Sequence, residues 1–73
     1  MARIDVKSEM TGSVWKILVE VGQQVAEEET VLLIEAMKME IPVIAPEAGV
    51  VAEIRVAEGD LVADGDVVMR LDA

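Results

Sequence analysis

The sequence predicts an all-β fold, namely a flattened antiparallel β-barrel or sandwich of about eight short strands in two sheets with pseudo-two-fold symmetry. Three observations support this prediction. Short runs rich in Val, Ile and Leu recur at regular spacing between turn residues. No run has the length and period of an amphipathic helix. The two halves of the chain repeat one another.

The repeat has an offset of 37 positions, which places residues 12–22 on residues 49–59. Glycines, β-branched residues and acids coincide along the alignment. We therefore expect one domain over residues 1–73, made of two β units at about 1–36 and 37–73. The offset places Lys38 on Met1. A two-fold axis would then set the Lys38 turn and the chain ends at opposite ends of the molecule.

Composition excludes several classes of function. The chain has 73 residues, a net charge of −9, no histidine and no cysteine. The acidic balance argues against nucleic acid as a partner. Zinc sites with His or Cys ligands and Ser-His or Cys-His nucleophiles are impossible, so we expect no metal and no catalytic residues. Paired-carboxylate chemistry is disfavoured because a small strand-rich domain has little room for a pocket.

The first half begins with a short alternating strand over residues 3–7, which suits a sheet edge. A longer strand is predicted over residues 12–21, ending at Gly22. Within it, Trp15 is interpreted as a packing residue with no chemical role. Residues 22–30 are interpreted as a turn rather than a helix, because three consecutive acids beside a Val-rich run do not complete an amphipathic period.

The same turn contains a departure from the repeat. The second half has Gly65 where the first half has Glu28. If this position requires a positive φ, Glu28 adopts a conformation that is uncommon for a residue with a Cβ.

The centre of the chain is a predicted hairpin. An apolar run over residues 31–34 leads into the lysine motif, and residues 39–44 form the return strand. Pro42 lacks an N–H, so the return strand is expected at a sheet edge. Met37 and Lys38 would stand near the tip. Tight two-residue turns prefer Asn-Gly or Asp-Gly, so the turn residues by themselves do not predict this hairpin.

The second unit starts after the proline and glycine of residues 45–49, and its main strands are predicted over residues 50–56 and 67–71. The core should come from apolar positions of both units: Val14, Ile17, Val19, Val25, Leu33, Val51, Ile54, Val56, Val62 and Val68.

The motif at the centre carries a family resemblance. It reads Glu35-Ala36-Met37-Lys38-Met39-Glu40. Ala-Met-Lys-Met resembles the attachment motif of biotinyl domains, the biotin carboxyl carriers in which a lysine amine holds biotin through an amide bond. The resemblance covers roughly residues 10–71 and implies the barrel-sandwich hybrid fold. Lipoyl domains usually show Asp-Lys-Ala at this place, so the methionines favour biotin over lipoate.

The resemblance implies a function and partners. A biotin protein ligase would join biotin to Lys38, and biotin carboxylase and carboxyltransferase components, those of an acyl-CoA carboxylase in our expectation, would then use it. Ala36 and Glu35 complete the motif, and Met37 and Met39 would serve recognition and packing at the tip. The alternatives are a lipoyl carrier with lipoate on Lys38 and an unmodified interaction module.

The remaining expectations concern the setting of the domain. The sequence has no apolar stretch of membrane-spanning length and no signal-peptide pattern, so a cytoplasmic protein without a membrane partner is expected. It also has no flanking linker of low complexity. A small free-standing carrier or an excised domain is therefore expected. The short connection over residues 22–30 leaves no room for the protruding loop that contacts biotin in some carriers.

Overall fold

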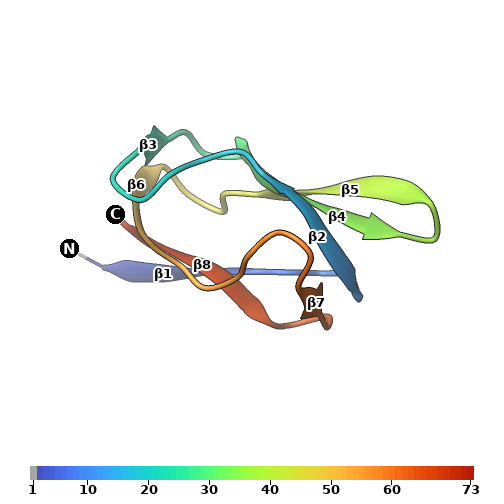
Figure 1. Ribbon diagram of the computed structural model, residues 1–73. Coiled ribbons are helices and arrows are strands. Elements are labelled where there is room, and N and C mark those ends of the chain that lie inside the picture. The colour runs from blue at the N-terminus through green and yellow to red at the C-terminus, as the bar shows by residue number, and fades with distance from the viewer. Residues whose placement is uncertain (1) are drawn as a thin grey trace.

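In the computed structural model, which describes residues 2–73, this part of the chain forms eight strands and no helix (Figure 1). The predicted all-β class and strand number are confirmed. The strands are β1 (Arg3–Lys7), β2 (Gly12–Ile17), β3 (Gln24–Val25), β4 (Thr30–Ala36), β5 (Met39–Ile44), β6 (Gly49–Ile54), β7 (Leu61–Val62) and β8 (Val67–Asp72). Within the described residues, no helix is long and apolar enough to cross a membrane.

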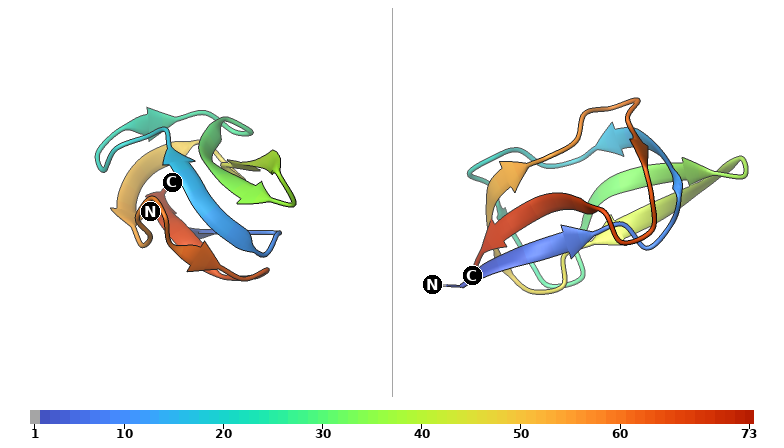
Figure 2. Two further views of the ribbon diagram at one scale, coloured as in Figure 1. Left: turned by 45° about the vertical axis from the view of Figure 1, so that its right-hand side comes forward. Right: turned by 90° about the horizontal axis from the view of Figure 1, so that it is seen from below.

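The strands form two four-stranded antiparallel sheets that face each other (Figure 2). The sheet with the order β1-β8-β6-β3 is called the terminal sheet here, because it contains the first and last strands. The sheet with the order β5-β4-β2-β7 is called the hairpin sheet. β1 and β5 are both edge strands, which confirms the edge positions predicted for residues 3–7 and for the strand with Pro42.

The two sheets are images of each other under the 37-residue offset. Adding 37 to the strands of the first half and subtracting 37 from those of the second converts one strand order into the other. Cross-strand pairs follow the same rule: Ile4 faces Leu71 in the terminal sheet, and Ile41 faces Ile34 in the hairpin sheet. The β-bulges between Val14 and Lys16 and between Val51 and Glu53 are related in the same way. The repeat is therefore a structural two-fold.

The chain ends complete this symmetry. Ala2 and Ala73 exchange two backbone hydrogen bonds, of 3.0 and 2.9 Å. Their counterparts under the offset, Met39 and Ala36, pair at the tip of the β4–β5 hairpin. The ends and the hairpin tip accordingly lie at opposite ends of the molecule (Figures 1 and 2). Met1, the counterpart of Lys38, lies outside the described residues.

The core fills the space between the sheets with aliphatic side chains. Six predicted core residues are buried, and Ile17, Ile54 and Val56 pack against them while partly exposed. The six are Val14, Val19, Val25, Val51, Val62 and Val68. Buried residues that the prediction left out are Val6, Val31, Leu32, Ile34, Val43, Ala45, Met69 and Leu71.

One residue was wrongly predicted to lie in the core. Leu33 lies on the outer face of the hairpin sheet, because its neighbours Leu32 and Ile34 point inward and side chains alternate along a strand. The expected burial of the whole apolar run on both faces is therefore corrected. Val31 and Leu32 are both buried because the register of β4 shifts between Thr30 and Leu32, which lets two successive side chains face the core.

Several acidic side chains accept hydrogen bonds that stabilise the turns. Four exposed side chains accept a hydrogen bond from the backbone N–H three residues earlier in the chain. They form two symmetry pairs, Gln23 with Asp60 and Glu29 with Asp66. The connection from residue 22 to residue 30 thus consists of two turns on either side of the short strand β3. This agrees with the prediction of a turn rather than a helix. Two predicted strands were too long, since β2 ends at Ile17 and β6 at Ile54.

Candidate functional site

The β4–β5 hairpin projects beyond the rest of the molecule (Figure 1). Its strands pair without interruption from Leu32 opposite Val43 to Ala36 opposite Met39, so only Met37 and Lys38 form the turn. The structure thus brings the predicted motif together in one place, with Lys38 at the tip.

The tip is open to solvent. Met37 is 92% exposed and Met39 is 62% exposed, and Lys38 is also exposed. Neither methionine fills a gap beside the turn. Ala36 is half-buried, and Glu35 is exposed. None of the ion pairs among residues 2–73 involves Lys38. Its ammonium group is therefore presented to water and to whatever approaches the tip.

The turn itself is strained. Met37 and Lys38 have φ values of 51° and 64°. Two-residue turns with positive φ at both central residues match the twist of a hairpin, and they normally use Asn and Gly. The left-handed conformation costs a residue with a Cβ roughly 1–2 kcal/mol. The cross-strand pairing of β4 and β5 sustains that cost and fixes where the lysine leaves the backbone.

Close packing just below the turn holds the hairpin to the barrel. Gly12 of β2 lies directly against β4, so that a Cβ on Gly12 would collide with the carbonyl oxygen of Glu35 and would stand 2.8 Å from Cγ2 of Ile34. The symmetry-related Gly49 lies in the same way against the carbonyl oxygen of Asp72, at 2.6 Å. Glycine at residue 12 therefore lets β2 support the strand that leads to the lysine.

An acidic pair flanks the lysine. Glu35 and Glu40 are directly opposite each other on β4 and β5, one pair below the turn. Like charges in facing positions destabilise a sheet. The symmetry-related pair in the terminal sheet, Asp72 and Arg3, is instead an ion pair with an N–O distance of 3.1 Å. Glu40 ends the same motif, but the predicted site residues ran only from Glu35 to Met39. The position of Glu40 opposite Glu35 follows from the strand register.

Two hollows in the described part of the molecule contain no paired carboxylates free for chemistry. A hollow of about 250 Å³ beside β5 is lined by a single acid, Glu9. A second hollow, of about 440 Å³, is lined by Asp60 and Asp66. Both of these carboxylates accept turn hydrogen bonds, from Ala57 N–H at 2.9 Å and from Ala63 N–H at 2.8 Å. Residues 2–73 contain no cluster of His, Cys, Asp or Glu that could hold a metal ion.

The chemical capability of the site is that of a single primary amine on a rigid base. A lysine amine can form an amide bond with a carboxylic acid once that acid is activated. The exposed tip leaves room for a catalyst to approach the amine from several sides. The hairpin therefore fits the covalent attachment of a carboxylic acid cofactor.

Comparison with known proteins agrees with this geometry. Residues 4–71 match the family described as "Biotin-requiring enzyme". The chain is 42% identical to a biotin/lipoyl attachment protein of Bacillus subtilis over 66 residues, which cover 90% of each chain. It is 44% identical to a biotin carboxyl carrier protein of Streptococcus mutans over 57 residues, which cover 78% of this chain and 44% of that one.

A solved structure gives the same result for the fold. The crystal structure of the urea carboxylase of Kluyveromyces lactis matches 99% of this chain with a TM-score of 0.92 and 38% sequence identity. The match covers 6% of that much longer enzyme.

Proposed function

Because the chain belongs to the family of biotin-requiring enzyme domains, we propose that Lys38 is the residue that carries biotin, through an amide bond to its ε-amine. The protein is a biotin carboxyl carrier with covalently bound biotin as its cofactor, and it is a carrier rather than a catalyst. Residues 1–73 act as one carrier unit in this proposal. The placement of Lys38 at the exposed tip of a rigid hairpin is the observation that carries it.

Attachment requires a partner, because the ammonium form of lysine is not a nucleophile. A biotin protein ligase would present the cofactor's carboxyl group as an acyl-adenylate and remove a proton from the Lys38 ammonium. The amine nitrogen then forms the amide bond and loses a second proton to solvent, while the acyl–phosphate bond breaks and AMP leaves. Met37 and Met39 flank the amine with exposed apolar side chains, and we assign them to recognition by this ligase.

Once attached, biotin supplies a ring nitrogen that carries a carboxyl group between the active sites of a carboxylase and a carboxyltransferase. The chain's own residues provide the reach: β4 and β5 hold the backbone of Lys38 away from the barrel, and the side chain adds a flexible stem. Biotin carboxylase and carboxyltransferase components are the partners of such a carrier. We propose an acyl-CoA as the acceptor, and the cytoplasm, where ATP and acyl-CoA are available, as the compartment.

The test is the intact mass of the protein after incubation with biotin, ATP and a biotin protein ligase. We expect a single adduct equal to biotin less one water, and peptide fragmentation should place it on Lys38. An adduct on another lysine would contradict the site. A lipoyl adduct on protein isolated from cells would instead support the lipoyl carrier, and an unmodified mass after incubation would support an interaction module.

A further inference from the structure

The outer faces of the two sheets differ in chemistry although their backbones are equivalent. The outer face of the terminal sheet carries one exposed apolar residue on β6, Val50, but seven other positions on this face are charged. They are Arg3, Asp5, Lys7, Glu53, Arg55, Arg70 and Asp72. The 37-residue offset assigns each a counterpart on the hairpin sheet, and four of these seven are apolar. The counterparts, in the same order, are Glu40, Pro42, Ile44, Lys16, Leu18, Leu33 and Glu35.

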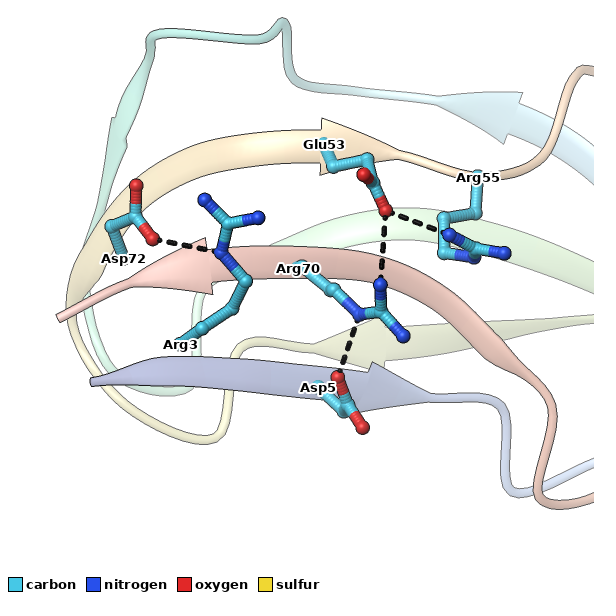
Figure 3. Close-up of polar contacts among 6 residues, drawn as sticks. All are labelled: Arg3, Asp5, Glu53, Arg55, Arg70 and Asp72. Carbon is cyan, nitrogen blue, oxygen red and sulfur yellow. Dashed lines mark hydrogen bonds and ion pairs between the residues drawn. The ribbon is translucent and has the colours of Figure 1, made fainter.

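The terminal sheet uses its charges in ion pairs (Figure 3). Arg70 donates to Asp5 at 3.0 Å and to Glu53 at 3.4 Å, so that one row across β1, β8 and β6 is joined by ion pairs. Arg55 donates to Glu53 at 2.8 Å. This face is therefore neutralised largely within itself.

The corresponding row of the hairpin sheet has no such pairing. Lys16 faces Leu33, and Leu33 faces Pro42. Beyond this row, Leu18 and Ile44 are 45% and 44% exposed. We call Leu18, Leu33, Pro42 and Ile44 the apolar face.

Trp15, the extra residue of the β2 bulge, lies beside the apolar face. It is 46% exposed, and the Lys16 ammonium lies 5.7 Å from the centre of its ring. Exposed tryptophan is common where proteins bind one another, because it gives a large contact area at a small entropic cost.

The fold does not require these apolar residues. The same backbone register in the terminal sheet accommodates an ion-paired row, so charged side chains at the hairpin-sheet positions would fold equally well. Exposed apolar side chains gathered on one face of a small protein indicate an interaction site. The difference between the two sheets therefore points to binding.

The position of the apolar face restricts its partner to the enzymes that act on Lys38. It lies on β4 and β5, the strands that continue into Lys38, so any enzyme that takes Lys38 into its active site has this surface close by. Glu35 and Glu40 lie between the apolar face and the tip, and no ion pair among residues 2–73 neutralises them. Their partner should therefore be basic around the entrance to its active site.

We propose that the apolar face, with Trp15, docks onto the biotin carboxylase component, and that the docking surface of this enzyme is apolar with a basic rim. This inference rests on the proposed function. The carboxylase binds bicarbonate and nucleotide phosphates, which are anions, so we expect cationic side chains around its active site that complement Glu35 and Glu40. A second copy of this chain is a poorer occupant, because both copies have a net charge of −9 and both present the same acidic pair.

The experiment copies the terminal-sheet row onto the hairpin sheet. The variant Lys16→Glu/Leu33→Arg/Pro42→Asp reproduces the row of Glu53, Arg70 and Asp5 and leaves Lys38 unchanged. The matched control, Glu53→Lys/Arg70→Leu, makes a similar change on the terminal sheet. Both variants and the wild type are biotinylated to completion, checked by mass and melting temperature, and used as substrates of the purified biotin carboxylase of the same organism.

We expect the triple variant to raise the KM for the carrier about tenfold or more with little change in kcat, and the control to change KM less than about twofold. An unchanged KM for the triple variant would overturn the proposal, as would an equal rise in the control. Slower biotinylation with normal carboxylation would assign the face to the ligase instead. A wild-type dimer that the triple variant dissociates would assign it to a second copy.

A different result would reject the proposed function itself. Wild-type protein that is biotinylated on Lys38 but not carboxylated would not be a carboxyl carrier, and this outcome is independent of the variants. A second substitution at the apolar face, Leu18→Arg, keeps the docking proposal testable if the triple variant fails to fold. It should raise KM in the same direction while leaving the melting temperature unchanged.

Discussion

Glu28 and Gly65 occupy equivalent turns of the two halves, and both have a positive φ, 68° and 93° respectively. The N–H of each donates a backbone hydrogen bond to an equivalent carbonyl, that of Ala45 at 2.8 Å and that of Ser8 at 2.7 Å. The turn therefore has one geometry in both halves, although only one half has the residue that adopts it without strain.

Glycine should relieve that strain. We expect the unfolding free energy of Glu28→Gly to equal that of the wild type or to exceed it by up to about 1 kcal/mol. The relief of strain at a left-handed position offsets the larger conformational entropy that glycine loses on folding. Urea denaturation measures the difference. The control is Glu27→Gly, whose φ is not positive, and it should lower stability by about 0.5–1 kcal/mol. A loss of stability in Glu28→Gly as large as that of the control would contradict the argument.

The tip turn is strained for the same reason. Met37→Asn should stabilise the protein by about 0.5–1 kcal/mol, since asparagine tolerates the left-handed region and is favoured at this position of a two-residue hairpin turn. Thermal unfolding provides the measurement. Met39→Asn introduces the same residue one position beyond the turn, where φ is not positive. It should give no gain, and a comparable gain there would show that hydrophilicity rather than backbone conformation is responsible.

Lys38 should matter for labelling and not for folding. We expect Lys38→Arg and Lys38→Ala to abolish biotin incorporation by a ligase, because neither offers a primary amine, while their melting temperatures stay within a few degrees of the wild type. Lys16→Ala, which removes another exposed lysine, should be labelled normally. Unfolding of the Lys38 variants would mean that the tip contributes to the core.

Gly12 should be intolerant of even a methyl group. Gly12→Ala places a Cβ against the Glu35 carbonyl oxygen and Ile34, so we expect a loss of about 1–3 kcal/mol in unfolding free energy. Ser13→Ala, the neighbouring change that adds no atom, should stay within about 0.5 kcal/mol. Gly49→Ala should cost a similar amount to Gly12→Ala if the two halves are mechanically equivalent. A clear difference between the two losses of stability would show that the β4–β5 hairpin and the chain ends do not accommodate the added methyl group equally well.

Glu53 gives the terminal sheet a pH dependence. A hydrogen bond from Arg55 lowers the pKa of Glu53 below its ordinary value of 4.5, and the charges of Arg55 and Arg70 act in the same direction. A carboxylate with a depressed pKa in the folded state stabilises that state above the ordinary value and loses the effect as the pH falls through the folded pKa.

Glu53→Gln should therefore be less stable than the wild type at pH 7, and the two stabilities should converge below pH 4.5. Chemical denaturation at a series of pH values gives the comparison. Because these side chains are partly exposed, the difference should also shrink at high salt. A gap between the two proteins that is the same at low and neutral pH would show that the carboxylate charge is not the cause.

Much of the fold was accessible from the sequence because the repeat constrains it. The offset predicted the two-fold and the positive φ of Glu28, since both follow from comparing one half with the other. The edge positions followed from local features, namely the short alternating pattern of residues 3–7 and the missing N–H of Pro42. The predicted burial of Leu33 was wrong, because a continuous apolar run does not reveal which side chains face inward. The bulge in β4 decides this, and it is set by the pairing of β4 with β5.

At the candidate site, the motif singled out Lys38 but did not predict the geometry around it. The turn residues Met37 and Lys38 have no sequence preference for the left-handed region, so their conformation depends on the long-range pairing of β4 with β5. The opposition of Glu35 and Glu40 likewise required the strand register. The contrast between the outer faces of the two sheets appears only when the repeat is combined with that register.

The mutual hydrogen bonds of Ala2 and Ala73 have an architectural consequence. Since the first and last described residues are neighbours, this unit could be inserted into a longer polypeptide with both connections on one side, at the opposite end from Lys38. A short bridge from residue 73 back to residue 2 would close the backbone into a ring. Reopening that ring at residues 46–48 should yield a rewired chain whose attachment hairpin is intact.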